Sequence, residues 1–123
     1  MSHPMLAREL REAIGKHGAW KLKLKTSVTI GKAMVPSKEA ECCDCCDFGR
    51  WLAAPEQVQD LGQTVQYRVI NRLHREFHQC AARVIKAIED GDTVKAARIL
   101  DTEFVPQSDH LVRGISKWAS EAD

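Results

Sequence analysis

The chain has 123 residues, and we predict one domain spanning residues 1–123, small enough that a metal or a partner subunit would help to stabilise its single core. Its 18 basic and 17 acidic residues give a formal net charge of +1, which argues against nucleic acid or an anionic membrane as a partner. No apolar run approaches the roughly 20 residues that span a bilayer, and the charged segment from Met1 to Arg11 lacks the apolar stretch of a signal peptide, so we expect a cytoplasmic protein with no membrane partner.

Helical periodicity dominates the chain, and strand signals are almost absent, so the predicted fold class is all-α. The first helix is expected over residues 5–33. After a proline, Ser37 is expected to cap a short helix that runs through a cysteine cluster, and a second short turn should carry residues 49–52.

Two longer helices are expected in the rest of the chain. The first covers residues 55–90, with a proline in its first turn and an irregularity at Gly62, and Gly91 ends it. Asp92 then caps a last helix with near-heptad apolar spacing, in which Pro106 should produce a kink.

Three long helices and a short one favour an antiparallel four-helix bundle in which the short helix carries a cysteine of the cluster. The helix over residues 55–90 has a further apolar face, formed by Val65, Val69, Leu73, Phe77 and Val84. A helix that is apolar on most sides is buried on most sides. In a domain this small, that pattern predicts a second subunit.

Three histidines fall on the apolar faces of two predicted helices. His74 and His78 are four residues apart, so both imidazoles project from one helix face, and His17 lies on the apolar stripe of the first helix. Cys46, on the short helix, would complete a tetrahedral set of three imidazoles and a thiolate, which suits Zn²⁺. Without a ligand, three buried imidazoles would each need hydrogen-bond partners. We therefore predict a metal site of His17, Cys46, His74 and His78, with no catalytic residues.

Three sequence blocks surround these four residues, HGAWK from residue 17, CDFGRWL from residue 46 and HREFH from residue 74. Together they resemble the bacterial chemoreceptor zinc-binding (CZB) domain family, and the middle block, Cys-x-x-Gly-x-Trp-Leu, is the most specific. The resemblance implies that His17, Cys46, His74 and His78 are the zinc ligands. It also implies a homodimer that reports zinc or oxidants to a chemoreceptor or a diguanylate cyclase.

The cysteine cluster departs from the family pattern. Family members usually carry one cysteine there, whereas this chain has Cys42, Cys43, Cys45 and Cys46, so the sulfur that binds the metal stays open. In a reducing cytoplasm we expect metal ligands or reactive thiols rather than structural disulfides. The extra thiols would either form a disulfide with Cys46 under oxidation or be exposed bystanders, and Cys80 is expected to be a small buried residue.

The C-x-x-C pairs 42/45 and 43/46 are also typical of zinc fingers and dithiol redox proteins, but the spacing to the histidines and the absence of a βαβ setting do not fit either class. The block at residues 74–78 superficially resembles the metalloprotease motif H-E-x-x-H. Its acid, Glu76, lies about 200° around the helix from His74 and faces away from the metal. Four protein ligands would leave no open position for water, so we predict that the chain is not an enzyme. A di-iron site of the hemerythrin type would need bridging carboxylates that are missing at helical spacing.

The predicted function is a zinc-binding sensory domain that responds to zinc or oxidants through a His₃Cys site and signals to a chemotaxis or cyclic-di-GMP effector. No effector domain is present in these residues, so the effector would be a partner in trans or another part of a longer polypeptide. The alternative is a structural zinc or zinc-buffer protein without signalling output. A sensor requires Cys46 to react, whereas a structural site should be inert.

Overall fold

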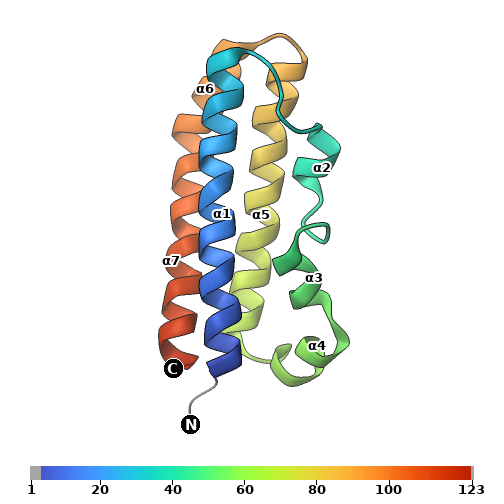
Figure 1. Cartoon of the computed structure of the whole chain (residues 1–123), viewed down its shortest axis with the longest axis vertical. Coiled ribbons are helices and arrows are strands. Elements are labelled where there is room, and N and C mark those ends of the chain that lie inside the picture. The colour runs from blue at the N-terminus through green and yellow to red at the C-terminus, as the bar shows by residue number, and fades with distance from the viewer. Residues whose placement is uncertain (1–3, 123) are drawn as a thin grey trace.

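The structure is a computed structural model that describes residues 4–122, and these residues form an all-α bundle without strands (Figure 1). This confirms the predicted fold class. In chain order the elements are α1 (Pro4–Ile30), α2 (Ser37–Glu41), α3 (Asp47–Ala53), α4 (Pro55–Leu61), α5 (Val65–Glu89), α6 (Thr93–Ile99), the π-helical turn η1 (Leu100–Phe104) and α7 (Val105–Ala122).

The bundle has four antiparallel columns (Figure 1). The long helices α1, α5 and α7 form three of them, and the short helices α2, α3 and α4 follow one another along the fourth. Each column runs opposite to the one before it, so α1 begins and α7 ends at the same end of the bundle. α5 contacts α1, α2, α6, η1 and α7, which makes it the central helix.

Two glycines end the helices that carry the histidines. Gly31 and Gly91 have φ values of 69° and 81°, a backbone conformation that favours glycine. The next helix begins as predicted, because the Asp92 side chain accepts a hydrogen bond from the backbone N–H of Lys95 at 3.0 Å. The predicted cap at Ser37 is wrong. Ser37 is the first residue of α2, preceded by Pro36, and no side chain caps this helix.

The predicted continuous helix over residues 55–90 is also wrong. A turn over residues 62–64 separates α4 from α5, so the irregularity expected at Gly62 is a full break. Thr64 starts the new helix, because its hydroxyl oxygen accepts a hydrogen bond from the backbone N–H of Tyr67 at 3.2 Å.

A π-helical turn interrupts the last helical segment directly before Pro106, where an interruption was expected. The backbone N–H of Val105 donates to the carbonyl oxygen of Leu100, five residues earlier. Pro106 follows as the second residue of α7 and has no N–H to donate. A wider turn before it leaves room for the proline ring while the chain remains helical.

The further apolar face expected on α5 is mostly covered by the chain itself. Leu73, Phe77 and Val84 are buried in the core, and Val65 and Val69 are 71% and 38% exposed. Only the first turns of α5 therefore keep exposed apolar residues that a second subunit could cover. Within residues 4–122, no helix has both the length and the apolar character needed to cross a bilayer.

Candidate metal centre

The four predicted residues meet inside the bundle, between three of its columns. His17 comes from α1, Cys46 directly precedes α3, and His74 and His78 come from α5. The three histidines are each 1% exposed, and Cys46 is half-buried. One nitrogen of each histidine and the Cys46 sulfur all lie within 4.8 Å of one another. This is the convergence that helical spacing predicted, with Cys46 as the sulfur.

Backbone carbonyls fix the orientation of two imidazoles. The Nδ1 atom of His17 lies 2.8 Å from the carbonyl oxygen of Ala13, and the Nδ1 atom of His78 lies 2.9 Å from that of Ala40. Because a carbonyl oxygen only accepts, each Nδ1 carries the proton and each Nε2 keeps a lone pair. His78 Nε2 is fully buried and has no hydrogen-bond partner. A buried acceptor of this kind is expected to have a ligand, and a carbonyl behind the imidazole is the usual support of a metal-binding histidine.

Cys46 occupies the N-cap position of α3. Its sulfur accepts a hydrogen bond from the backbone N–H of Gly49 at 3.3 Å, and it lies 3.3 Å from His74 Nε2 and 4.0 Å from His17 Nε2. The first N–H groups of a helix have no partner within the helix, and together with the helix dipole they favour the thiolate form of a cysteine at the N-terminus. The first turn of α3 therefore supports a negatively charged ligand pointing at the histidines.

Burial sets the protonation of the cluster. It lowers the pKa of His17 to about 4 and that of His74 to about 2, and it lowers the pKa of His78 as well. All three imidazoles are therefore neutral at pH 7, which is the form that binds metals. Burial raises the pKa of the Cys46 thiol, so a nearby cation is needed to hold it as a thiolate. Three neutral nitrogens and one such sulfur match the donor set of a structural Zn²⁺ site.

Aromatic rings enclose the cluster. The Phe48 ring makes edge contacts with His17 and His74, with centroids 5.6 and 5.2 Å apart, and the Trp20 ring lies 5.7 Å from that of His78. Trp51 stacks on Phe48 at 5.8 Å. These apolar rings limit the access of water to the four ligand atoms, as expected for a closed site.

Two of the remaining cysteines are bonded to each other, contrary to the prediction. Cys42 and Cys45 form a disulfide, although reduced thiols were predicted. Their C-x-x-C spacing was the available sequence signal, and it was outweighed by the expected reducing compartment. Cys43 is a free thiol 3.7 Å from the Asp44 carboxylate, and Cys80 is buried on α5 as predicted. Among the described cysteines, Cys46 is the one that joins the histidines.

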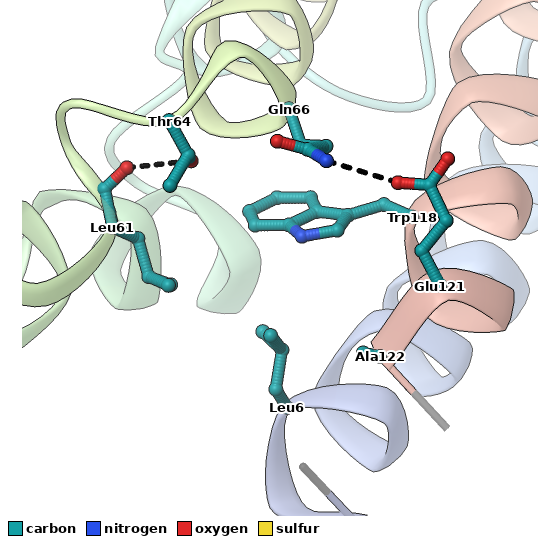
Figure 2. Close-up of a pocket in the computed structure, with 7 residues that line it drawn as sticks. All are labelled: Leu6, Leu61, Thr64, Gln66, Trp118, Glu121 and Ala122. Atoms are coloured by element: carbon teal, nitrogen blue, oxygen red, sulfur yellow. Dashed lines mark hydrogen bonds between the residues drawn. The ribbon is translucent and has the colours of Figure 1, made fainter. Parts of the chain in front are cut away.

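Glu76 is not part of the cluster, in keeping with its predicted position on another face of α5. Its carboxylate accepts a hydrogen bond from the Gln107 amide at 3.2 Å. A separate pocket of about 190 Å³ lies at the end of the bundle near the N-terminus of α1 and the C-terminus of α7 (Figure 2). It is lined by Leu6, Leu61, Thr64, Gln66, Trp118, Glu121 and Ala122. Two of its polar side chains have partners within the pocket, since Thr64 donates to the Leu61 carbonyl and Gln66 to Glu121 (Figure 2).

The fold and the donor set together define a helical-bundle zinc protein. The chemoreceptor zinc-binding domain family matches residues 17–85, which is more than half of the chain. The chain therefore belongs to this family of sensory domains, and its cofactor is Zn²⁺. The matched range contains all four residues of the cluster. No curated protein and no solved structure matches the chain.

Proposed function

We propose that His17, Cys46, His74 and His78 together bind one Zn²⁺ per chain and that this site makes the domain a regulatory sensor of zinc or oxidants. The observation that carries the proposal is the convergence of three buried imidazole nitrogens and one sulfur within 4.8 Å, with His78 Nε2 lacking a partner. Bound zinc would supply the positive charge that keeps the Cys46 sulfur ionised. With four protein ligands the site has no position for a reacting water, so the domain would regulate rather than catalyse.

Cys46 would be the responsive ligand. Among the four residues, only its sulfur is readily oxidised, and it sits at the start of a helix of 7 residues. The next residue, Asp47, makes a salt bridge with Lys16 of α1 at 2.7 Å. The ring of Trp51 contacts that of Trp118 in α7, with the ring centroids 6.4 Å apart. Loss of the sulfur ligand would release α3 first. Release of α3 would remove packing from both α1 and α7.

The effector would be a chemotaxis receptor or a cyclic-di-GMP enzyme, in cis or in trans, and the domain would act in the cytoplasm as a homodimer. The family supports the first part, since its members are named for chemoreceptors. Val65 and Val69, which line a shallow pocket with Trp118, are exposed apolar residues that a second copy could cover. Light scattering should report a dimer at micromolar concentration, and a monomer at all concentrations would contradict this part.

Ligand variants test the metal site. Cys46→Ala or His78→Ala should weaken zinc binding by at least about 100-fold, since changes merely beside a metal ligand already cost 10–100-fold. The melting temperature should fall with the affinity, because the metal joins separate segments. Cys43→Ala is the matched control, since it removes a neighbouring thiol outside the cluster. Unchanged affinity in Cys46→Ala, with loss in Cys43→Ala, would show that the sulfur is wrongly assigned.

Oxidant treatment separates a sensor from a structural zinc protein. Peroxide should convert the Cys46 thiolate to a sulfenic acid, which can condense with the Cys43 thiol to give a disulfide and water. Mass spectrometry should find Cys46 modified before Cys80, and hydrogen exchange should rise over residues 46–53 while α5 and α7 stay protected. Exchange that rises evenly over all helices, or a Cys46 that stays unmodified, would favour the structural or zinc-buffer alternative.

A further inference from the structure

The cysteine loop, residues 42–45, lies directly against the proposed metal centre. The carbonyl oxygen of Cys43 is 3.5 Å from the Cys46 sulfur. A Cβ atom on Gly49 would lie 1.6 Å from the same carbonyl oxygen, so this loop and the first turn of α3 are in close backbone contact. The conformation of the loop therefore determines where the Cys46 sulfur points.

The loop also connects two groups that position metal ligands. On its N-terminal side, the carbonyl oxygen of Ala40 in α2 orients the imidazole of His78 at 2.9 Å. On its C-terminal side, Cys46 begins α3. The Cys42–Cys45 disulfide closes the loop between them, at the C-cap of α2. The disulfide thus restricts the conformation of the loop that sets the position of α3 relative to α2.

We propose that the Cys42–Cys45 pair is a second redox centre, which sets the zinc affinity of the site without contributing a ligand to it. The closed disulfide holds the loop in the conformation that presents Cys46, and its reduction frees the loop and weakens zinc binding. The inference rests on the proposed ligand set. Cys45 is exposed, so a reductant can reach the bond. A dithiol would transfer two electrons and two protons, breaking the S–S bond into two thiols while the dithiol itself becomes a disulfide.

Oxidation would then act on the domain in two opposite ways. Oxidation of the Cys42–Cys45 pair tightens the site, whereas oxidation of Cys46 removes a ligand. The disulfide also withdraws Cys42 and Cys45 as partners for an oxidised Cys46, which leaves Cys43 as the nearby free thiol. A mild oxidant would close the Cys42–Cys45 disulfide and tighten zinc binding, whereas a stronger oxidant would modify Cys46 and remove this ligand.

The first test compares zinc affinity in the two redox states, by competition with a coloured chelator. Wild-type protein with the disulfide should bind zinc about 3- to 20-fold more tightly than protein reduced with a phosphine, the gain expected from closing a short loop. The double variant Cys42→Ala/Cys45→Ala should show the weaker affinity under both conditions, and Cys43→Ala should keep the difference. Equal affinity of the wild type in both states would overturn the proposal while leaving the zinc site intact. Failure to bind zinc in either state would overturn both.

The second test uses reciprocity. If the disulfide raises zinc affinity by some factor, zinc must stabilise the disulfide by the same factor. Titration against a dithiol–disulfide couple should therefore show that zinc lowers the reduction potential of the pair, by about 30 mV for each tenfold change in affinity. A zero or opposite shift would overturn the proposal. Uptake of a second zinc on reduction would also overturn it, because the pair would then be a metal site itself.

Discussion

At the scale of single residues, the site depends on Gly49, a position where a hydrogen fits and a methyl group does not. Gly49→Ala would place a Cβ atom 1.6 Å from the Cys43 carbonyl oxygen. Because that atom belongs to the backbone, the loop or α3 must shift. We expect zinc affinity to fall at least about tenfold and the free energy of unfolding to fall by about 1–3 kcal/mol, as for other overpacked sites.

Gly15→Ala is the matched control for this substitution. Gly15 is exposed on α1, and nothing lies within 4 Å of the position that a Cβ atom would take there, so alanine should stabilise the helix by up to about 1 kcal/mol. Zinc competition and urea unfolding check both variants. Wild-type affinity in Gly49→Ala would contradict the close packing of loop and helix.

The convergence of the three histidines was predictable from the sequence, because helical spacing fixes the direction of their side chains. A separation of four residues places His74 and His78 on one face, and the apolar stripe of α1 places His17 inside. The sulfur was harder to assign, because Cys42, Cys43, Cys45 and Cys46 lie within five positions and none of the four is in a helix. The Cys42–Cys45 disulfide was missed because reduced thiols are expected in a reducing compartment. Which thiols meet depends on the turn conformation, which periodicity does not describe.

At the scale of elements, α3 is short and is tied to α5 by a side chain. The hydroxyl of Tyr67 in α5 donates a hydrogen bond to the carbonyl oxygen of Leu52, in the last turn of α3, at 2.5 Å. Tyr67 is 8% exposed. Tyr67→Phe keeps the ring but leaves this carbonyl without its donor, and we expect a loss of about 1–3 kcal/mol in the free energy of unfolding.

Hydrogen exchange should show where this loss is felt. In Tyr67→Phe, the amides of α3 should exchange faster, whereas those in the middle of α5 should not. Phe48→Leu is a useful comparison, because it removes the ring that contacts His17 and His74 while keeping the hydroxyl contact. Faster exchange throughout α5 in Tyr67→Phe would show that the hydroxyl stabilises the long helix rather than α3.

The order of the elements was largely predictable, and the errors have local causes. The break between α4 and α5 was underestimated, because apolar periodicity continues across Gly62 while Thr64 provides a new cap. The interruption expected at Pro106 was located correctly, but its form, the π-helical turn η1 directly before α7, is not described by apolar periodicity. Whether a second apolar face of α5 meets another subunit or the same chain depends on how the columns pack. The sequence pattern is the same in both cases.

At the scale of the whole molecule, the ligand set joins α1, the column of short helices and α5, while α7 contributes packing and no ligand. α7 instead lies close to α5, and Gly114 allows this, since a Cβ atom there would be 2.9 Å from a methyl group of Ile70. Two kinds of contact therefore hold the bundle together, side-chain packing and the proposed metal ligands. Packing alone holds α7 against the other long helices, whereas the short column packs into the core through Ala40, Phe48 and Leu52 and is also joined to α1 and α5 by the proposed ligands. Removal of zinc should consequently loosen the short column first.

Without zinc, the buried histidines should make the whole fold sensitive to mild acid. In the unfolded chain each histidine has a pKa near 6.5, whereas burial lowers the pKa of His17 to about 4 and that of His74 to about 2, and also lowers that of His78. Below about pH 6.5 the unfolded chain therefore binds protons that the folded chain does not. The free energy of unfolding should therefore decrease as the pH is lowered from about 6.5 to 5, by up to about 1.4 kcal/mol per pH unit for each histidine.

Urea unfolding of chelator-treated protein at several pH values measures this slope. His74→Gln should reduce the slope by up to about 1.4 kcal/mol per pH unit, whatever its effect on stability at pH 7, because it removes one group that titrates only in the unfolded chain. Zinc-loaded protein should also lose stability on acidification, since protons compete with the metal for the same nitrogens. A slope of zero in the metal-free protein would mean that the folded chain takes up protons on these histidines, and the cluster would then not be the closed, neutral site that its burial indicates.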